Sequence, residues 1–272
     1  MARAGRLGVL DDRSSSCRLV GMAESDRQNL YDNDEFFAGY SRVRDNPLAL
    51  NYTIEQPAIR ALLPLEIVNG KRVLDLGCGA GGFARWLIGQ GSSSVLGIDP
   101  SKNMIAVANE EHSASIEYRQ SFVQELDLPE EDFDLVVSSL MFHYIEDLQP
   151  VVKNIRRWLR TGGSLVFSIE HPIAMAIQGK RSGWIKNDEG VRVGWEVTDY
   201  SDEGERVSHW IVDGVVKYHR TVSTVMNMLA DSGFRIDKVS EAYATPEGEE
   251  LDPDLLEERM RPPFLFVRAT AD

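Results

Sequence analysis

From Lys71 onward, short apolar runs alternate with longer amphipathic stretches, a pattern typical of strands separated by helices. Such an alternation forms a parallel sheet with helices on both faces. We expect strands at Arg72–Gly77, Ser94–Asp99, Ile116–Phe122, Phe133–Leu140 and Ser164–His171. The helices between them should span Gly82–Gln90, Ser101–His112 and Asp147–Leu159. The fourth strand is almost entirely apolar, which predicts a central place in the sheet.

The pattern changes after His171. Residues 172–220 are too long for an ordinary connection in such a sheet, so we expect an inserted lid there. Within it, Glu205–Val212 and Val215–Arg220 flank Asp213-Gly214, a residue pair that favours a tight turn, and they predict a β-hairpin. The tryptophans of the lid could line an apolar pocket or form a small core of the lid itself.

The N-terminal part of the chain lacks the strand pattern. Helical spacing around Phe36 and Tyr40, with prolines between the helical stretches, predicts a helical cap at residues 26–70. Residues 1–25 are rich in Arg, Ser and Gly and should be a disordered extension. Whether Met22 is the native start stays open.

The C-terminal part returns to the sheet. A helix should run from about Thr221 to Gly233, because glycine is favoured just beyond a helix end. Two last strands are expected at Arg235–Ala242 and Phe264–Thr270. The α/β core would therefore consist of residues 71–171 and its C-terminal part, residues 221–272.

The charge of the chain limits the kinds of partner that it can have. Its 272 residues carry a formal net charge of −14, which disfavours nucleic acids and anionic membranes because both require clusters of Lys and Arg. No apolar run approaches the roughly 20 residues needed to cross a bilayer, so a cytoplasmic location is the simplest interpretation. Two cysteines predict neither a disulfide framework nor a metal site. The oligomeric state is left open.

The glycine-rich loop after the first strand fits two cofactors. Gly77, Gly79 and Gly82 match the dinucleotide pattern, and Asp99 follows near the spacing of a ribose-binding acid, so a nicotinamide-dependent oxidoreductase is one alternative. Asp75 stands two residues before the first glycine, where it would repel a pyrophosphate. S-adenosylmethionine has an ammonium and a sulfonium group instead, which a carboxylate attracts. Asp75 therefore favours S-adenosylmethionine.

Four ordered motifs resemble the class I S-adenosylmethionine-dependent methyltransferase superfamily, small-molecule type. The resemblance runs from about residue 30 to the C-terminus. It implies a Rossmann-like, doubly wound α/β fold with a seven-stranded sheet, whose last strand is antiparallel. The motifs are Val-Leu-Asp-Leu-Gly-Cys-Gly-Ala-Gly at 73–81, Gly-Ile-Asp-Pro-Ser at 97–101, Phe-Asp-Leu-Val at 133–136 followed by 138–144, and Leu-Arg-Thr-Gly-Gly-Ser-Leu at 159–165.

The resemblance implies that Asp75 and the loop backbone hold the methionine moiety and that Asp99 binds the ribose. Met104 would either cover the adenine or pack in the core. The family's Asp near the end of the third strand is missing here, because the stretch reads Gln-Ser-Phe-Val-Gln at 120–124. Tyr40 and Arg44 share one helical face and could reach the cofactor carboxylate, or be a core Tyr beside a solvated Arg. The expected cofactor contacts are Tyr40, Arg44, Asp75, Gly77, Cys78, Gly79, Asp99, Pro100, Met104, Phe122, Val123 and Ser139.

The acceptor side is expected where the strands end. Methyl transfer mainly needs alignment of nucleophile and methyl group, but a hydroxyl or protonated nitrogen acceptor also needs a base. Histidine suits this role near neutral pH. We expect transfer to oxygen, nitrogen or carbon of a small organic metabolite, aromatic or heterocyclic; a non-catalytic cofactor-binding protein is the other alternative. The candidate catalytic residues are His143, His171, Glu170, Tyr218 and His219.

Overall fold

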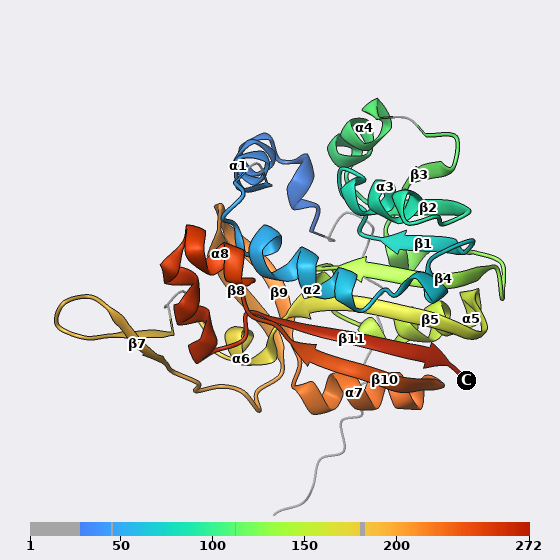
Figure 1. The fold of residues 1–272 in the computed structure, drawn as a ribbon. Helices are drawn as coiled ribbons and strands as arrows, with labels where there is room; N and C mark the ends of the chain where they lie inside the picture. The colour runs from blue at the N-terminus through green and yellow to red at the C-terminus, as the bar shows by residue number, and fades with distance from the viewer. Residues whose placement is uncertain (1–27, 45, 112, 180–182) are drawn as a thin grey trace, which may run out of the picture.

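The structure is a computed structural model, and it describes residues 28–44, 46–111, 113–179 and 183–272. The disordered extension expected at residues 1–25 lies outside the described residues, and so does the side chain of Arg44. In the described part, one sheet lies between two layers of helices, and a small hairpin projects at one side (Figure 1).

The central sheet has seven strands in the order β10-β11-β5-β4-β1-β2-β3. They span Arg72–Leu76 (β1), Ser94–Asp99 (β2), Ile116–Gln120 (β3), Phe133–Ser139 (β4), Leu159–Glu170 (β5), Phe234–Glu241 (β10) and Phe264–Ala271 (β11). Neighbouring strands are parallel except at β11, which runs antiparallel to both β5 and β10. This arrangement confirms the expected Rossmann-like sheet with an antiparallel last strand. The apolar β4 is also central, as its sequence predicts.

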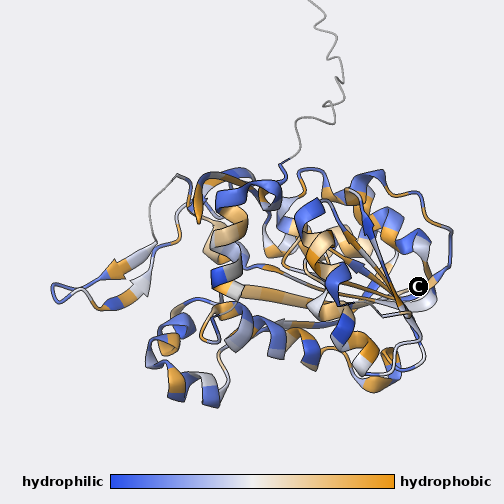
Figure 2. Cartoon of the chain, turned by 90° about the horizontal axis from the view of Figure 1, so that it is seen from above, coloured by the Kyte–Doolittle hydropathy of each residue, from blue (hydrophilic) through white to orange (hydrophobic). Residues whose placement is uncertain are grey.

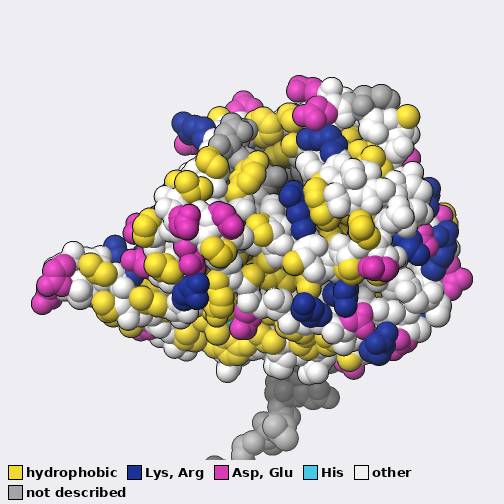
Figure 3. All heavy atoms as spheres, in the orientation of Figure 1, with side chains coloured by type: hydrophobic (Ala, Val, Ile, Leu, Met, Phe, Trp, Pro, Cys, Tyr) yellow, Lys and Arg dark blue, Asp and Glu magenta, His cyan; other side chains and the backbone are white. Residues whose placement is uncertain are grey.

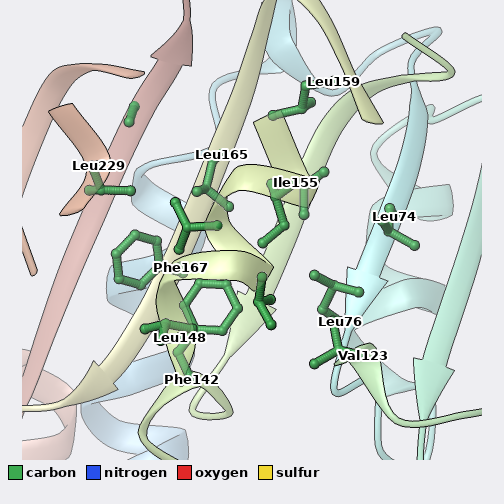
Figure 4. Close-up of a cluster of buried hydrophobic side chains, with 14 of the residues drawn as sticks. Leu74, Leu76, Val123, Phe142, Leu148, Ile155, Leu159, Leu165, Phe167 and Leu229 are labelled. Carbon is green, nitrogen blue, oxygen red and sulfur yellow. The ribbon is translucent and has the colours of Figure 1, made fainter. Parts of the chain in front are cut away.

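Successive strand residues point to opposite faces and build two apolar clusters, one on each side of the sheet. In β4, Val136 belongs to one cluster, whereas Leu135 and Val137 belong to the other. Figure 4 shows part of the first cluster, which α5 and α7 cover; α2 and α3 cover the second. In Figure 2 the hydrophobic strands lie between helices that are polar on their outer sides. These helices span Leu148–Trp158 (α5), Val222–Asp231 (α7), Gln56–Ala61 (α2) and Gly82–Gly89 (α3).

Shorter helices complete the layers, and polar side chains fix where several of them begin. Ser101 accepts a hydrogen bond from the Met104 N–H at 3.1 Å, and Thr221 accepts one from Thr224 at 3.2 Å, so α4 and α7 start at capping residues. The remaining helices span Leu30–Asp32 (η2), Asp34–Arg44 (α1), Asn51–Glu55 (η3, a π-helix), Leu65–Ile67 (η4), Lys102–Glu110 (α4), Val123–Glu125 (η5), Phe142–Tyr144 (η6), Pro172–Met175 (α6), Pro246–Leu251 (α8) and Pro253–Met260 (η7).

The expected hairpin is present as β8 (Gly204–Trp210) and β9 (Val212–His219), but its predicted turn is wrong. Trp210 pairs with Val212 in the ladder, so the chain reverses at Ile211, which has a φ of 66°. Asp213 and Gly214 instead form a bulge within β9, where the positive φ of Gly214 is tolerated because glycine lacks a Cβ.

The start of β5 also differs from the expectation. The strand begins at Leu159 rather than at Ser164, because Leu159 already pairs with Phe133 of β4. The ladder then shifts register before Ser164 pairs with Leu135. An ion pair between Arg160 and Asp134 at 2.7 Å holds this irregular stretch against β4. Thr161, Gly162 and Gly163 therefore lie within the strand.

A second hairpin in the lid was not predicted. It consists of β6 (Trp184–Lys186) and β7 (Arg192–Trp195) and projects at the left of Figure 1. The Trp184 and Trp195 rings meet edge to face at 5.1 Å, and the Arg261 guanidinium lies over both rings. These two half-buried tryptophans therefore pack against each other and against Arg261, which follows η7.

Replacing Phe266 by Ala should destabilise the fold strongly. Phe266 in β11 is fully buried in the second cluster, so the truncation should lower the free energy of unfolding by about 3–5 kcal/mol. Denaturant unfolding measures this change. Val239→Ala in the exposed part of β10 is the control and should cost less than about 1 kcal/mol. Equal losses in the two variants would contradict the assigned core.

Candidate active site

The carboxyl ends of the parallel strands meet at one edge of the sheet, the place where open α/β sheets bind ligands. The loop after β1, the end of β2 and the segments after β4 and β5 all lie there. Figure 3 shows the surface hollowed between α1 and α4, on the side of this edge.

The loop between β1 and α3 is tied to the end of β2. The backbone N–H groups of Gly77 and Cys78 both donate to the carbonyl oxygen of Ile98, at 2.8 and 3.0 Å. Gly77 has a φ of 76°, and a Cβ atom there would lie 2.8 Å from the side chain of Met141. This position therefore requires glycine for its conformation and for the close approach.

Asp75 lies under this loop and is only 1% exposed. Its Oδ2 atom has no hydrogen-bond partner among the described residues. Burial, and then the charges of Asp99 and Glu55, raise the pKa of Asp75 to about 8. A buried carboxyl oxygen without a donor is rare in folded proteins, and a cationic donor of a ligand would satisfy it.

Asp99 ends β2 beside the same loop. Its two carboxyl oxygens accept hydrogen bonds from the backbone N–H groups of Gly79 at 3.0 Å and Ser101 at 2.9 Å. Burial raises the pKa of Asp99 to about 6, although these two donors favour the ionised form. The carboxyl group thus fixes the loop and the start of α4 relative to each other.

Glu55 is a third carboxyl group at this edge, and sequence reasoning missed it. It ends the π-helix η3 and is fully buried. Its Oε1 accepts hydrogen bonds from the hydroxyls of Ser139 at 2.8 Å and Ser168 at 2.7 Å. Its Oε2 accepts from the side-chain amides of Asn51 at 3.0 Å and Gln56 at 2.8 Å. Glu55 stands between Ile54 and Gln56 without a recognisable motif, so only the structure identifies it. π-Turns are frequent at functional sites.

The segment at residues 28–32 connects the cofactor side of this edge with the lid. Asp32 accepts hydrogen bonds from the Ser101 hydroxyl at 2.7 Å and the Asn103 N–H at 3.2 Å, so it binds the start of α4. Burial alone would raise the pKa of Asp32, but these hydrogen bonds lower it below its ordinary value. At the other end, the Gln28 side chain pairs with both backbone groups of Val216 in β9, at 2.8 and 3.1 Å.

An ion pair between a buried lysine and a half-buried glutamate joins the lid hairpin to the end of β5. Lys217 of β9 is 7% exposed, and its ammonium group binds the Glu170 carboxylate. The same ammonium lies 5.2 Å from the Trp210 ring centre and 5.8 Å from that of Tyr144. Burial would raise the pKa of Glu170, but Lys217 and then His143 lower it, so Glu170 is ionised at neutral pH.

Aromatic side chains from the cap pack against the tip of this hairpin. Phe36 and Tyr40 of α1 meet the Trp210 ring at 5.4 and 6.1 Å, and Tyr31 meets Tyr40 at 4.9 Å. A side-chain hydrogen bond joins Tyr31 to Tyr144, which follows β4. The cap, the β8–β9 hairpin and the segment after β4 thus share one group of packed rings. It consists of Tyr31, Phe36, Tyr40, Tyr144 and Trp210, and we call it the aromatic cluster.

His143 lies beneath the lid and is 3% exposed. Burial lowers its pKa to about 4, so the imidazole is neutral at physiological pH. Its Nδ1 accepts a hydrogen bond from the Glu170 N–H at 3.3 Å, which places the ring proton on Nε2. Beside it lies a cavity of about 20 Å³. Its walls are Phe142, His143, Leu148, Phe167, Ile169, Glu170, Pro172, Met175, Tyr218, Arg220 and Val225.

Known proteins are similar to this chain in sequence and fold. Residues 74–167 match a family model described as a methyltransferase domain. The crystal structure of an S-adenosylmethionine-dependent methyltransferase from Mesorhizobium loti has a TM-score of 0.74 and 41% identity, covering 84% of this chain and 99% of that one. An uncharacterized protein of Haemophilus influenzae is 36% identical over 251 residues, 89% of this chain and 96% of its own. A ubiquinone biosynthesis O-methyltransferase of Bradyrhizobium diazoefficiens is 36% identical over 132 residues, 46% of this chain and 51% of its own.

The chain belongs to the class I S-adenosylmethionine-dependent methyltransferases. Its cofactor is therefore S-adenosylmethionine, and the nicotinamide-dependent oxidoreductase that the glycines alone allowed is wrong. The non-catalytic alternative is set aside on the same ground. Within the described residues of this methyltransferase, no helix is long and apolar enough to span a membrane.

Two candidate catalytic histidines of the methyltransferase lie outside the lining of the small cavity. His171 accepts a hydrogen bond from the Ile173 N–H at 3.1 Å through Nδ1, so it caps α6, and its Nε2 contacts Glu241 at 2.9 Å. Both ring nitrogens are therefore engaged by the protein. His219 contacts the carbonyl oxygen of Tyr200 at 2.8 Å through Nε2, and its buried Nδ1 has no partner in the described part of the chain.

The cofactor contacts expected from the sequence divide into two groups. Asp75, Gly77, Cys78, Gly79, Asp99 and Ser139 lie together where β1, β2 and β4 end. The others are more dispersed. Met104 and Val123 are buried, and Val123 packs in the first core cluster; Phe122 is half-buried, and the Pro100 carbonyl accepts a hydrogen bond from Gln120 at 3.1 Å. Tyr40 belongs to the aromatic cluster.

Replacing Asp32 by Ala should loosen the N-terminal segment from α4. We expect a loss of about 1 kcal/mol in the free energy of unfolding at neutral pH, because the start of α4 loses its acceptor. The lowered pKa means that this contribution is present above the ordinary Asp pKa and disappears as pH falls through the lower folded-state value. Denaturant unfolding at about pH 7 and pH 3 measures both effects. Asp34→Ala, at an exposed acid of α1, is the control; a similar loss there would contradict the capping role.

Proposed function

We propose that this methyltransferase methylates a small organic acceptor, aromatic or heterocyclic, in the cytoplasm. The acceptor would lie between the carboxyl ends of β4 and β5 and the β8–β9 hairpin. The observation that carries this proposal is the cavity beside His143, which combines apolar walls with the polar side chains of His143, Glu170, Tyr218 and Arg220. Small-molecule sites typically pair an apolar lining with few polar groups.

The donor side of the site fits S-adenosylmethionine. Asp75 offers a buried Oδ2 without a partner, which suits the cofactor ammonium, and Asp99 carries a carboxylate beside the loop, which suits ribose hydroxyls. When bound, S-adenosylmethionine supplies a methyl group on a sulfonium centre that leaves as a neutral thioether. We assign the donor contacts of the chain to Asp75, Gly77, Cys78, Gly79, Asp99 and Ser139, with Tyr40, Arg44, Pro100, Met104, Phe122 and Val123 as further candidates.

On the acceptor side, the polar groups have different tasks. Neutral His143 carries its proton on Nε2, so we assign it a hydrogen bond that orients the acceptor. Glu170 is ionised and is the group that takes up an acceptor proton, while Lys217 balances its charge. Tyr218 lines the same cavity and would position the acceptor ring.

The lid must move for an acceptor to enter. The cavity of about 20 Å³ has room for a single water molecule and is too small for a metabolite. The β8–β9 hairpin is attached to β5 by the Lys217–Glu170 pair and to the cap by the aromatic cluster, so displacing the hairpin would enlarge the cavity. Aromatic walls then favour a flat, unsaturated acceptor.

Labelled S-adenosylmethionine tests the proposal directly. The full chain would be incubated with the methyl-labelled donor and a panel of small phenols, heterocyclic amines and aliphatic acids. Oxygen acceptors come first, because the Bradyrhizobium relative is by name an O-methyltransferase, although the match covers only half of that protein. Label on an aromatic or heterocyclic compound supports the proposal. Label on proteins or nucleic acids alone contradicts it.

His143→Ala and His171→Ala should differ in their effects. Because His143 lines the cavity, its loss should lower turnover by at least about tenfold with unchanged cofactor affinity. His171 caps α6, so its loss should cost about 1 kcal/mol of stability and little turnover. Steady-state kinetics, calorimetry with S-adenosylhomocysteine and thermal melts measure the three quantities. His209→Ala, at an exposed position, is the control; equal turnover in all variants would remove His143 from the site.

A further inference from the structure

Three carboxyl groups converge beneath the cofactor loop, and each has a different supply of hydrogen-bond donors. Glu55 accepts four side-chain hydrogen bonds, and Asp99 accepts two from the backbone. The Oδ2 atom of Asp75 accepts none from the described residues, although Asp75 is the most central of the three in the sheet. Donors favour the ionised form of a carboxyl group, so Asp75 is the group least able to carry a charge.

The surroundings of Asp75 add to this difference. It faces Glu55 from η3, Asp99 from β2, Cys78 from the loop and Tyr118 from β3. All four are acidic groups, and no cation from the described part of the chain contributes to the field at Asp75. Burial raises the pKa of the Cys78 thiol and of the Tyr118 hydroxyl, so both are neutral near pH 7. A charge on Asp75 would therefore meet two carboxylates and no counter-ion.

We propose that Asp75 holds a proton in the cofactor-free protein, kept there by Glu55 and Asp99, and that the cofactor's ammonium group displaces this proton to solvent. In the free protein the carboxyl group is neutral. In the complex the carboxylate pairs with the ammonium, which keeps its own protons, so one proton leaves for each cofactor bound. The raised pKa of Asp75, about 8, agrees with this exchange. The inference goes beyond the proposed acceptor and holds whatever the acceptor is.

Glu55 is a positioning residue in this scheme. Ser139 and Ser168 come from the ends of β4 and β5, and Asn51 and Gln56 from the cap, so donors from three regions of the chain hold the Glu55 carboxyl group near Asp75. Through its charge, Glu55 favours the protonated form of Asp75 until the cofactor arrives. It acts through Asp75 and needs no contact with the cofactor.

The scheme predicts opposite pH dependences for stability and for affinity. The pKa of Asp75 is raised in the folded chain, so its contribution to stability is present below the ordinary Asp pKa and is lost as pH rises toward 8. Cofactor affinity should rise over the same range, because a smaller fraction of the protein carries the Asp75 proton that the cofactor must displace. From about pH 6 to pH 7 the gain should be about tenfold. A purely structural role for Asp75 would not link the two trends.

Calorimetry of S-adenosylhomocysteine binding tests the exchange without turnover. At about pH 6.5, titrations in phosphate and in imidazole, whose ionisation enthalpies differ, should show release of about one proton per molecule bound. 5′-Methylthioadenosine lacks the ammonium and should release none. No release with S-adenosylhomocysteine, or equal release with both compounds, would overturn the proposal. These measurements use the unchanged protein, so they decide even if a variant does not fold.

Two variants and a matched control locate the proton. Asp75→Asn should abolish proton release and lower affinity; continued release would show that another group titrates. Glu55→Gln should shift the pH at which affinity stops rising below the native value of about 8, and an unchanged profile would remove Glu55 from the scheme. Asp134→Asn also removes one negative charge, but at the amino end of β4, where Asp134 bonds Arg72 and Arg160. Proton release should be unchanged in that variant. If the native protein releases the proton but methylates none of the panel compounds, the proposed acceptor is wrong and this inference stands.

Discussion

The burial of carboxyl groups where the parallel strands end is the constraint on which the active site depends. A buried carboxylate needs donors, and the fold recruits them from distant parts of the chain. Ser139 and Ser168 lie 84 and 113 residues from Glu55, yet both hydroxyls point to it. The π-helix η3, which interrupts the helical cap, brings Glu55 to these serines. The cap and the sheet are thus joined by a polar contact as well as by the second apolar cluster, to which the cap residues Ile54 and Ile59 belong.

On the proposed acceptor side, the buried charged group is a cation, and it needs an anionic partner. Lys217 is buried in the lid, and Glu170 supplies the charge that its ammonium needs. The rings of Trp210 and Tyr144 surround the pair with apolar area, and their faces attract the cation. A partly buried ion pair of this kind contributes less to stability than to geometry, because desolvation of the lysine offsets much of the attraction. Its role is to fix where the hairpin rests on β5.

The sequence was most informative about the sheet and the cofactor loop. Strand positions follow from local runs of apolar residues, and Asp75 and Asp99 could be found because they stand at fixed places beside glycines. The hairpin turn could not be placed correctly. Asp213-Gly214 has turn chemistry, but the packing of Trp210 on Phe36 and Tyr40 accompanies a reversal at Ile211. The local preference of Asp213-Gly214 for a turn therefore does not decide where the chain reverses.

The roles of individual side chains were harder to predict, because they depend on partners far away in the sequence. His143 and His171 look alike in the sequence, since both follow a strand end. Only the structure shows that His143 lines a cavity and that both nitrogens of His171 are engaged, one of them by Glu241, 70 residues away. Glu55 gave no usable signal, because nothing in its neighbourhood indicates that four donors converge on it.

The segment at residues 28–32 has a consequence for the order and strength of ligand binding. It contacts the start of α4 through Asp32 and the lid strand β9 through Gln28. With the donor and the acceptor bound at the sites proposed above, a ligand that stabilises one of these contacts would help to order the element beside the other ligand. Such coupling is reciprocal. The methyl donor changes the free energy of acceptor binding by the same amount as the acceptor changes the free energy of donor binding. We therefore expect the affinity for each substrate to depend on whether the other is bound. The five residues 28–32 would carry this dependence without contacting either substrate.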